Sequence, residues 1–287
     1  MKKSSLLKFL LSVAVLFSAA GAAHADDKAI TIGVNNWAEN IAVANMWKIL
    51  LDEKGYNVKL QSADKALLYN GVANGQIDMT FEVWLPTLDK PAYDKVKERV
   101  ALIGPWFKEA NLGLAVPDYV NVDSIDQLNA NKSLFAASGR PKIVGIDSGS
   151  SLMRETETAK NSYKLDWDVQ PSSESAMILS LERAESRKEP IVVTLWKPHW
   201  IWSKYKLKYL KDPKGEFGST DSIYGIETQA FKKQHPDVER WLQKWKMDDN
   251  SLGSLMSEIN KQGATTPEKG TRTWIDAHRS LVQQWLQ

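Results

Sequence analysis

Three tryptophans stand where apolar runs of the sequence give way to loops: Trp37, Trp84 and Trp196. An indole ring presents an electron-rich face that attracts a cation, and each such contact contributes about 0.5–2 kcal/mol. A quaternary ammonium group has no N–H to donate, so an aromatic cage suits it better than a hydrogen-bonded ion pair. If the fold brings these three rings together, they are expected to bind a quaternary ammonium group.

A proline follows two residues after Trp84 and two residues after Trp196, in the stretches W-L-P and W-K-P. Proline has no N–H and cannot extend a central strand, so each of these tryptophans is expected at a sharp strand exit. A single tryptophan is more often a core residue than a ligand contact, so the interpretation depends on the recurrence of the pattern. Trp200 and Trp202, in W-K-P-H-W-I-W, are expected to pack a helix onto the protein.

A second pattern, V-G-I-D-S-G-S-S-L-M-R, predicts a strand, a turn with glycine and the start of a helix. The free backbone N–H groups of Ser150, Ser151 and Leu152 would then point into a cleft, where a helix start binds a carboxylate or phosphate. The alternative is that Ser150 only caps its own helix. No Gly-Lys-Ser/Thr follows, so this is not a Walker loop. A cage together with an anion site would fit a zwitterion such as a trimethylammonium carboxylate.

Strand patterns alternate with helical patterns along the chain. Strands are expected at 29–34, 58–61, 77–84, 112–117, 142–147 and 190–196. Helices are expected at 40–54, 64–74, 148–160, 176–184, 235–246, 249–262 and 267–287, with one more beginning at 124. This order predicts an α/β protein with largely parallel sheets and right-handed crossovers.

The alternation restarts near residue 112, which predicts two lobes with a ligand cleft between them. The first lobe is expected to be discontinuous, with residues 26–114 and 225–287, and the second to hold residues 115–224. Two short strands, near 112–116 and 223–227, are expected to cross between the lobes. The three tryptophans follow strand ends of both lobes, so they are expected to meet in the cleft.

Residues 1–25 have the features of a secretory signal peptide. A basic start is followed by an apolar run at 9–20, which is too short for the roughly 20 residues that span a bilayer. The A-H-A pattern predicts cleavage after Ala25. The sequence has no cysteine, which excludes a lipid anchor at a cysteine, disulfides and a cysteine nucleophile. The expected location is the periplasm of a Gram-negative bacterium, without an anchor.

The charges nearly cancel, with 37 basic and 35 acidic side chains in the whole chain. Removing the three lysines of the signal peptide from 37 leaves 34 basic side chains against the same 35 acidic ones. A nucleic-acid or anionic-membrane partner would favour a basic surface, so neither partner is expected.

A periplasmic hydrolase is the alternative of a different class. A serine nucleophile favours a G-x-S-x-G turn, but here G-I-D-S-G has Asp147 at the central position. No histidine stands in a pattern such as H-E-x-x-H, so no metal and no cofactor are expected. His199, close to Trp196, is kept as a candidate ligand-binding residue rather than as a general base. The protein is expected not to be an enzyme.

Four longer stretches resemble the substrate-binding proteins of ABC importers for glycine betaine, choline and related compatible solutes. They are W-A-E-N-I-A-V-A, V-W-L-P-T, G-I-D-S-G-S-S-L-M, and W-K-P-H-W with the following K-Y-K-L-K-Y-L-K-D-P. The resemblance covers essentially the whole chain after residue 25. It implies a two-lobed type-II periplasmic binding protein fold that closes at a hinge, and a monomer that works with a membrane permease and its ATPase. It also implies a cage of Trp37, Trp84 and Trp196, with the ligand carboxylate on the N–H groups of Ser151 and Leu152.

Two positions depart from the betaine-binding pattern. Some betaine-binding relatives have a histidine five residues after the W-L-P tryptophan, where this chain has Asp89, which would repel a carboxylate. Choline-binding relatives have an acid two residues after the first cage tryptophan, where this chain has Glu39. Glycine betaine is the first choice of ligand because the turn at 150–152 is intact. Choline or carnitine is the alternative, and a sensory partner in place of an importer stays open.

Overall fold

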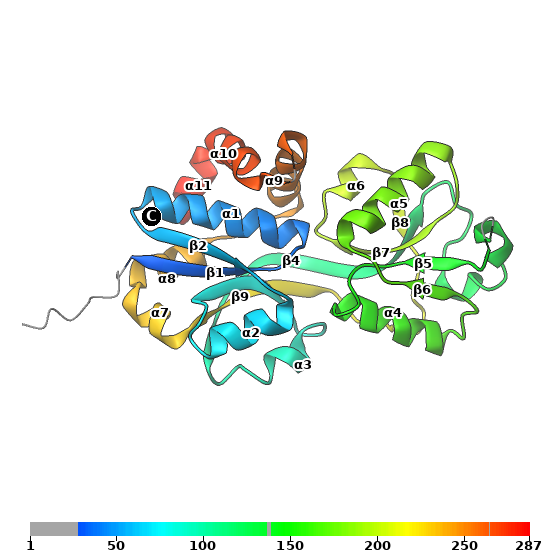
Figure 1. The fold of residues 1–287 in the computed structure, drawn as a ribbon, viewed down its shortest axis with the longest axis horizontal. Coiled ribbons are helices and arrows are strands. Elements are labelled where there is room, and N and C mark those ends of the chain that lie inside the picture. The colour runs from blue at the N-terminus through cyan, green and yellow to red at the C-terminus, as the bar shows by residue number, and fades with distance from the viewer. Residues whose placement is uncertain (1–27, 137–138, 264) are drawn as a thin grey trace, which may run out of the picture.

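The computed structural model describes residues 28–136, 139–263 and 265–287. The predicted signal peptide lies outside the described residues. Figure 1 shows two lobes side by side, each with helices on both sides of a sheet. No helix in the described part of the chain is long and apolar enough to cross a membrane.

The first lobe contains parallel strands in the order β2-β1-β3. These strands are β1 (Ala29–Val34), β2 (Asn57–Ser62) and β3 (Met79–Leu85). The helices that follow them are α1 (Ala38–Glu53), α2 (Lys65–Ala73) and α3 (Lys90–Tyr93). The chain returns to this lobe with α7 (Gln229–Gln234), α8 (Pro236–Lys244), α9 (Asp249–Gln262), α10 (Pro267–Ala277) and α11 (Arg279–Trp285). In Figure 1, α1 and α10 lie on one side of the sheet and α2 on the other.

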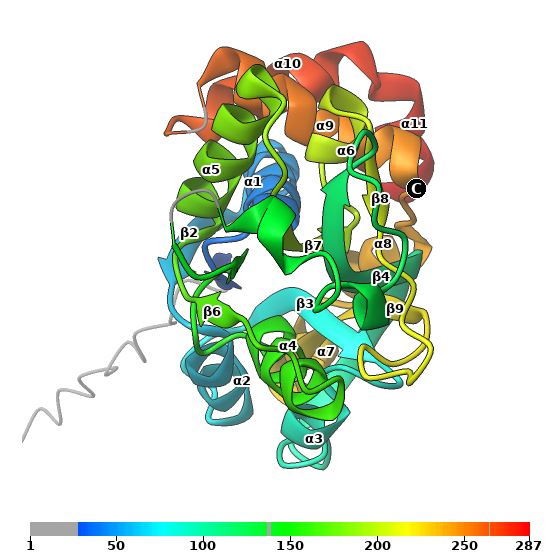
Figure 2. The same cartoon turned by 90° about the vertical axis from the view of Figure 1, so that its right-hand side faces the viewer.

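The second lobe repeats the parallel arrangement on a smaller scale. Its strands are β5 (Lys142–Val144), β6 (Asp168–Gln170), β7 (Val192–Lys197) and β8 (Leu207–Tyr209). Its helices are α4 (Ser151–Ser162), α5 (Glu174–Arg187) and α6 (Ile201–Lys204), with short 3₁₀ turns at Ile125–Gln127 and Lys132–Phe135. Figure 2 looks onto this lobe and shows α5 above its strands and α4 below them.

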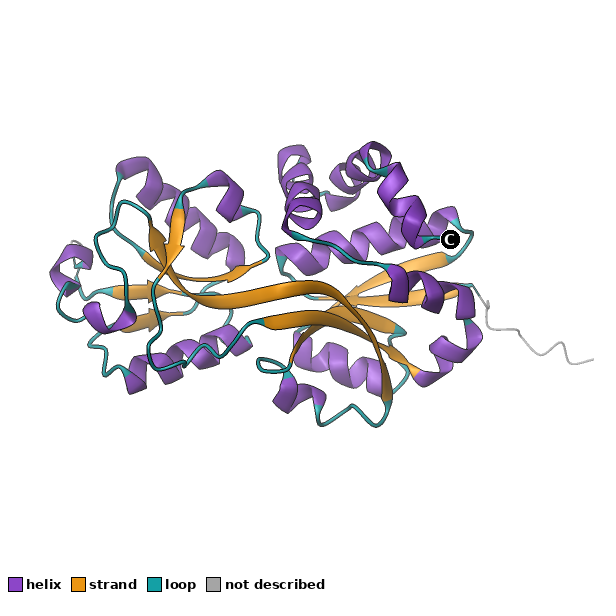
Figure 3. Cartoon of the chain, turned by 180° about the vertical axis from the view of Figure 1, so that it is seen from behind, coloured by secondary structure: helices purple, strands orange, loops and turns teal. Residues whose placement is uncertain are grey.

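Two long strands connect the lobes: β4 (Val100–Pro117) and β9 (Asp221–Thr228). β4 pairs with β9 over its first part and with β7 and β8 over its last part, so one sheet continues from lobe to lobe. Figure 3 shows these strands crossing between the lobes. The predicted domain boundaries fall inside β4 and β9, and they stay a prediction because the sheet is continuous there.

Aromatic rings hold β4 to the core of the first lobe. Trp106 of β4 stacks on Trp245, with ring centroids 4.6 Å apart and planes 8° apart. Trp47 of α1 meets Trp245 edge-on at 5.5 Å, and the Trp106 Nε1–H donates to the carbonyl of Phe81 at 2.9 Å. The connecting strand is therefore fixed where it enters the first lobe.

The strand that the sequence predicted at 112–117 is too short. It is the last part of β4, whose earlier part was missed. Gly104 and Pro105 interrupt the apolar run there, and the pairing with β9 shifts register between Ile103 and Phe107. A broken register removes the period-two pattern on which strand prediction depends.

Other elements also differ from the prediction. The helix expected after residue 124 is a single 3₁₀ turn, the strand expected at 142–147 ends at Val144, and the helix expected at 267–287 is interrupted at His278. The short elements α3, α6, β6 and β8 were not predicted, because three or four residues are too few for a periodic pattern.

Candidate functional site

Trp37, Trp84 and Trp196 line one small cavity between the two lobes, with about 320 Å³ of empty space when the open solvent at its mouth is included. The other residues that line it are Glu39, Lys65, Glu82, Leu88, Leu112, Ile146, Ser150, Ser151 and Leu152.

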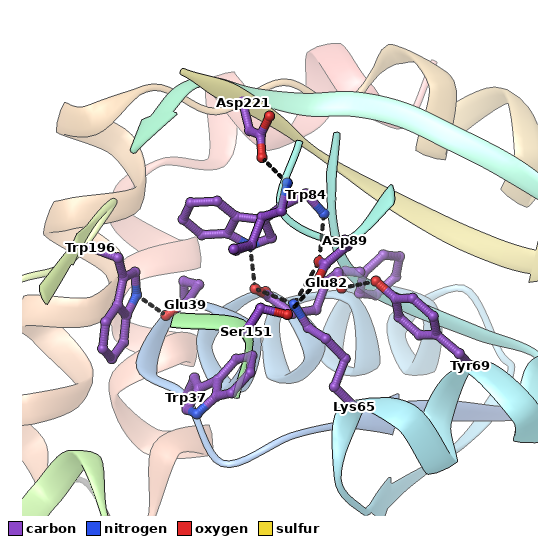
Figure 4. Close-up of polar contacts among 12 residues, drawn as sticks. Trp37, Glu39, Lys65, Tyr69, Glu82, Trp84, Asp89, Ser151, Trp196 and Asp221 are labelled. Atoms are coloured by element: carbon purple, nitrogen blue, oxygen red, sulfur yellow. Dashed lines mark hydrogen bonds and ion pairs between the residues drawn. The ribbon is translucent and has the colours of Figure 1, made fainter. Parts of the chain in front are cut away.

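The strand ends position the three rings as the sequence predicted. Trp37 lies between β1 and α1, while β3 and β7 end directly before Pro86 and Pro198 and carry Trp84 and Trp196. Each indole N–H donates to a carboxylate: Trp37 to Asp147 (3.0 Å), Trp84 to Glu82, and Trp196 to Glu39 (3.0 Å). Figure 4 shows the three rings around one space. Because every indole N–H is already bound, the rings can offer only their faces and edges to a ligand.

The other two tryptophans of W-K-P-H-W-I-W support Trp196 from behind, and neither lines the cavity. The Trp202 Nε1–H donates to the carbonyl of Trp196 at 2.8 Å, and its ring packs on Tyr209 at 4.6 Å. Trp200 stacks on His199, with ring centroids 5.6 Å apart. The cluster therefore fixes one cavity wall.

His199 lies outside the cavity, behind the ring of Trp196. It meets that ring edge-on at 4.8 Å. Its Nδ1 accepts the backbone N–H of Ile201 at 3.1 Å, so the ring proton lies on Nε2, which faces Glu174 Oε1 at 3.1 Å. These contacts position Trp196, and the structure gives His199 no place among the lining residues.

The start of α4 offers fewer free N–H groups than the sequence predicted. The backbone N–H of Ser150 is not free, because it donates to the carbonyl of Asp147 at 3.1 Å. Its side chain caps the helix by accepting the N–H of Met153 at 3.2 Å. Ser151 and Leu152 are the first two residues of α4, and their N–H groups have no acceptor in the described chain. The prediction was therefore wrong for the N–H of Ser150, and two donors remain.

Two buried acids lie against the cavity. Glu39 and Glu82 are each 1% exposed. Burial, together with the nearby charges of Glu82 and Glu174, raises the pKa of Glu39 well above its usual value. Burial raises the pKa of Glu82 to about 7, although the charge of Lys65 opposes this shift. The buried position of Glu39 therefore disfavours its charged form, relative to a free glutamate in water.

Asp89 lies behind the wall of the first lobe and is paired with a lysine. Its Oδ2 lies 2.7 Å from Lys65 Nζ and also accepts the backbone N–H of Trp84 at 2.8 Å. The loop that carries Asp89 is fixed by Asp221, which accepts the backbone N–H groups of Thr87 and Leu88, each at 2.8 Å. The ion pair with Lys65 offsets the negative charge that the sequence predicted at this position.

Hydrogen bonds join the lobes around the cavity. The Trp37–Asp147 and Trp196–Glu39 bonds each connect one lobe to the other. Two further contacts do the same: Ala38 N–H to Glu174 Oε2 (3.1 Å) and Ser151 Oγ to Asp89 Oδ1 (3.4 Å). The lobes are therefore closed against each other.

Sequence reasoning missed several lining residues: Lys65, Glu82, Leu88, Leu112 and Ile146. Glu82 stands two residues before Trp84 on one strand, and the period of two could have placed both on one face. Lys65 begins a helix that carries no motif, so nothing in the sequence indicated it. Among the described residues, no group of three or more His, Asp or Glu side chains could hold a metal ion.

Residues 28–277 match the protein family described as the substrate-binding domain of ABC-type glycine betaine transport systems. Among solved structures, a glycine betaine/L-proline-binding protein of an ABC transporter from Borrelia burgdorferi is similar, with 30% identity and a TM-score of 0.83. That alignment covers 91% of this chain and 97% of the other. Lactococcal OpuAC, closed and complexed with glycine betaine, has 35% identity and a TM-score of 0.81, covering 91% of this chain and 100% of that one.

A binding protein for glycine betaine and carnitine transport from Listeria monocytogenes, GbuC, is 35% identical over 146 residues. The match spans 50% of this chain and 48% of that relative, so it covers about half the length of each. The similarity to the two solved structures over nearly the whole chain confirms the predicted fold class, a two-lobed α/β periplasmic binding protein.

Proposed function

The chain belongs to the family of substrate-binding domains of ABC-type glycine betaine transport systems, and we propose that it binds a trimethylammonium solute and delivers it to an ABC importer. Glycine betaine is the first choice of ligand. The cation lies in the cage of Trp37, Trp84 and Trp196, and the carboxylate lies at the start of α4.

Family membership confirms two earlier expectations. The protein resembles ABC-importer binding proteins because it is one of them, and such proteins bind a substrate and are not enzymes. The family works outside the cytoplasm. We place this member in the periplasm, free of a lipid anchor, where it meets the permease and its ATPase as a monomer.

The observation that carries the proposal is the lining of the cavity. Three indole rings from three strand ends share it with the first residues of α4. The rings suit a group with a diffuse positive charge and methyl surfaces. The N–H groups of Ser151 and Leu152, at the positive end of a helix dipole, suit a carboxylate. A trimethylammonium carboxylate has both groups within one small molecule.

The charges around the cavity support a betaine as the ligand more strongly than the sequence alone did. Asp89 is paired with Lys65 at 2.7 Å, and the raised pKa of Glu39 favours the neutral acid. Both acids therefore repel a ligand carboxylate less than a free aspartate or glutamate would.

Choline or carnitine is the second candidate, because Glu39 and Glu82 line the cavity. An acid there could accept a ligand hydroxyl in a charge-assisted hydrogen bond, which contributes about 1.5–3 kcal/mol. Carnitine has a hydroxyl and a carboxylate, so it could use both the acids and the start of α4. These candidates use the same cage and differ only in the group at the far end.

A thermal-shift panel tests the proposal, since a ligand that binds only the folded state raises the melting temperature. The panel contains glycine betaine, choline, carnitine and proline betaine, with glycine as the control that lacks methyl groups. The largest shift is expected for glycine betaine and none for glycine. A panel in which no quaternary ammonium compound shifts the melting temperature would count against the function, and a larger shift for choline would move the assignment to the second candidate.

A further inference from the structure

Among the described residues that line the cavity, Lys65 is the one basic side chain. It is the first residue of α2, and its side chain is 13% exposed. Its Nζ lies 2.7 Å from Asp89 Oδ2 and 4.9 Å from the ring centroid of Trp37 (Figure 4). The lysine is therefore held at a defined place, against one ring of the proposed cage.

This place is unfavourable in a site for a simple cation. A trimethylammonium group against Trp37 would meet the positive charge of Lys65 close by, and like charges repel strongly where water is largely excluded. A ligand that also carries a carboxylate removes the conflict, because its negative charge can lie against the lysine. The chemistry of the cavity thus favours a zwitterion.

The contact with Asp89 leaves other N–H donors of Lys65 available. A lysine ammonium has three N–H donors, and one of them meets Asp89 Oδ2. Glu82 Oε1, at 3.9 Å from Nζ, lies beyond hydrogen-bond distance. Both oxygens of Asp89 are in use, because Oδ2 also accepts the N–H of Trp84 and Oδ1 faces the Ser151 hydroxyl at 3.4 Å. Lys65 keeps donors for a further anionic group, while Asp89 fixes its direction.

The donors of the second lobe lie next to this lysine. Lys65 Nζ and Ser151 Oγ contact the two oxygens of the same Asp89 carboxylate. Ser151 and Leu152 begin α4, a helix of 12 residues, and their backbone N–H groups have no acceptor in the described chain. A carboxylate at the start of α4 therefore lies within reach of the ammonium from the other lobe.

We propose that Lys65 binds the carboxylate of the ligand together with the backbone N–H groups of Ser151 and Leu152, and so selects zwitterionic quaternary ammonium compounds over simple cations. The inference rests on the proposed function, which assigns the other end of the ligand to the tryptophan cage. Lys65 is a binding residue, and Asp89 is a positioning residue that acts through it.

The test compares glycine betaine with tetramethylammonium, a quaternary cation without a carboxylate, by calorimetric titration of the whole protein. In Lys65→Met, the affinity for glycine betaine is expected to fall by about tenfold to a hundredfold, as the loss of a charge-assisted hydrogen bond predicts. The affinity for tetramethylammonium should stay or rise, because a repelling charge is gone. Lys65→Arg should retain more betaine affinity than Lys65→Met. Lys59→Met, at an exposed lysine of β2 in the same lobe, is the matched control and should change neither affinity.

Unchanged betaine affinity in Lys65→Met, or equal losses for both ligands, would overturn the inference while the proposed function stands. A parent protein that binds no quaternary ammonium compound would overturn both. If Lys65→Met does not fold because Asp89 is left buried without its cation, the double variant Lys65→Met/Asp89→Asn removes the pair together. That variant must lose glycine betaine selectively, and an unselective loss would overturn the inference in the same way.

Discussion

The two lobes contribute different chemistry to the same cavity. The first lobe supplies every acidic or basic side chain that lines it within the described chain: Glu39, Lys65 and Glu82. The second lobe supplies Trp196, Ile146 and the start of α4, none of which carries a charge. Both lobes supply cage rings, so the difference lies in the charges and not in the aromatic surface.

This difference gives a physical advantage if the lobes open and close at a hinge, as the resemblance in the sequence implies. A buried charge without a partner is costly, and the ion pair of Lys65 with Asp89 lies wholly within the first lobe. Parting of the lobes therefore leaves that pair intact. Between the lobes, parting breaks hydrogen bonds that water can replace, such as Trp196 to Glu39 and Ser151 to Asp89, and the exposed ion pair of Lys197 with Asp249. Closure is thus expected to bring the neutral N–H donors and the Trp196 ring of the second lobe against the first lobe, whose charged side chains are already in position.

The largest expected effect comes from removing cage rings of either lobe. Trp84→Ala and Trp196→Ala should each weaken the binding of glycine betaine by at least about tenfold, because each removes one face of the cage. Trp37→Ala should weaken it as much, at a smaller cost in stability, since this side chain is only half-buried. Calorimetric titration measures the affinities and thermal denaturation measures the stabilities.

Trp241→Ala is the matched control for these variants. Trp241 is a buried residue of α8 that does not line the cavity, so its loss should lower the melting temperature and leave the affinity unchanged. If two of the three cage variants bind like the parent protein, the cage is misassigned.

The next effect isolates the neutral donors of the second lobe. Ser151 is the first residue of α4, where proline is tolerated, and Ser150 before it has the extended backbone that proline requires. Ser151→Pro should therefore keep the helix and remove one N–H, which lowers betaine affinity by about tenfold and leaves tetramethylammonium affinity unchanged.

Ser151→Ala controls for the lost hydroxyl, which faces Asp89 in the parent protein. It should bind glycine betaine more tightly than Ser151→Pro does. Equal betaine affinities for the two variants would indicate that the N–H of Ser151 does not hold the ligand.

A smaller effect is expected from pH, and it should come from the first lobe alone. The folded chain keeps Glu82 protonated up to about pH 7, whereas an unfolded chain releases this proton near 4.5. The contribution of Glu82 to the free energy of unfolding is therefore present below pH 4.5 and is lost as the pH rises to about 7.

Ionised Glu82 attracts a cation, so choline should bind more tightly at pH 8 than at pH 6.

Titrations of choline across this pH range measure the effect, and Glu82→Gln should flatten it. A pH dependence that persists unchanged in Glu82→Gln would assign the titrating group elsewhere.

The smallest effect is expected for Glu39→Gln with glycine betaine as the ligand. Glu39 accepts the Trp196 N–H and its buried position disfavours its charged form, and a glutamine oxygen can accept the same bond. Betaine affinity should hold within about threefold, a change of less than 1 kcal/mol. With choline as the ligand, affinity should fall clearly if Glu39 accepts the hydroxyl. Tight choline binding that collapses in Glu39→Gln, together with negligible betaine binding, would reverse the choice of ligand.

The sequence predicted the tryptophans at strand ends because strand ends are local features, and a ligand cage formed by their rings stays a prediction. Apolar runs followed by W-x-P place Trp84 and Trp196 at carboxyl ends of strands. The two strands belong to different lobes and run in opposite directions, so these ends face the same cavity from either side. The sequence also predicted that a helix begins near Ser150. It did not show that the N–H and hydroxyl groups of Ser150 are used within the turn and the helix cap, so that they are not available to a ligand. The fold class followed from the same alternation of strands and helices.

The charge network could not be predicted, because it depends on long-range contacts. Lys65 meets Asp89, 24 residues away, and Glu39 meets Trp196, 157 residues away. Nothing in the local sequence shows that Lys65 will form a buried ion pair or that burial will raise the pKa of Glu82. For the same reason, Asp89 was expected to repel a carboxylate, whereas in the fold it holds a lysine.

The central claim is that the closed cavity binds both ends of a zwitterion, with charges from one lobe and neutral donors from the other. Calorimetric titration of the parent protein with glycine betaine and with choline, in one buffer at pH 7, tests it most directly. Both ligands have the trimethylammonium group, and only glycine betaine has the carboxylate. We expect glycine betaine to bind at least about tenfold more tightly, a difference of about 1.4 kcal/mol. Choline binding as tightly as glycine betaine, or more tightly, would contradict the claim.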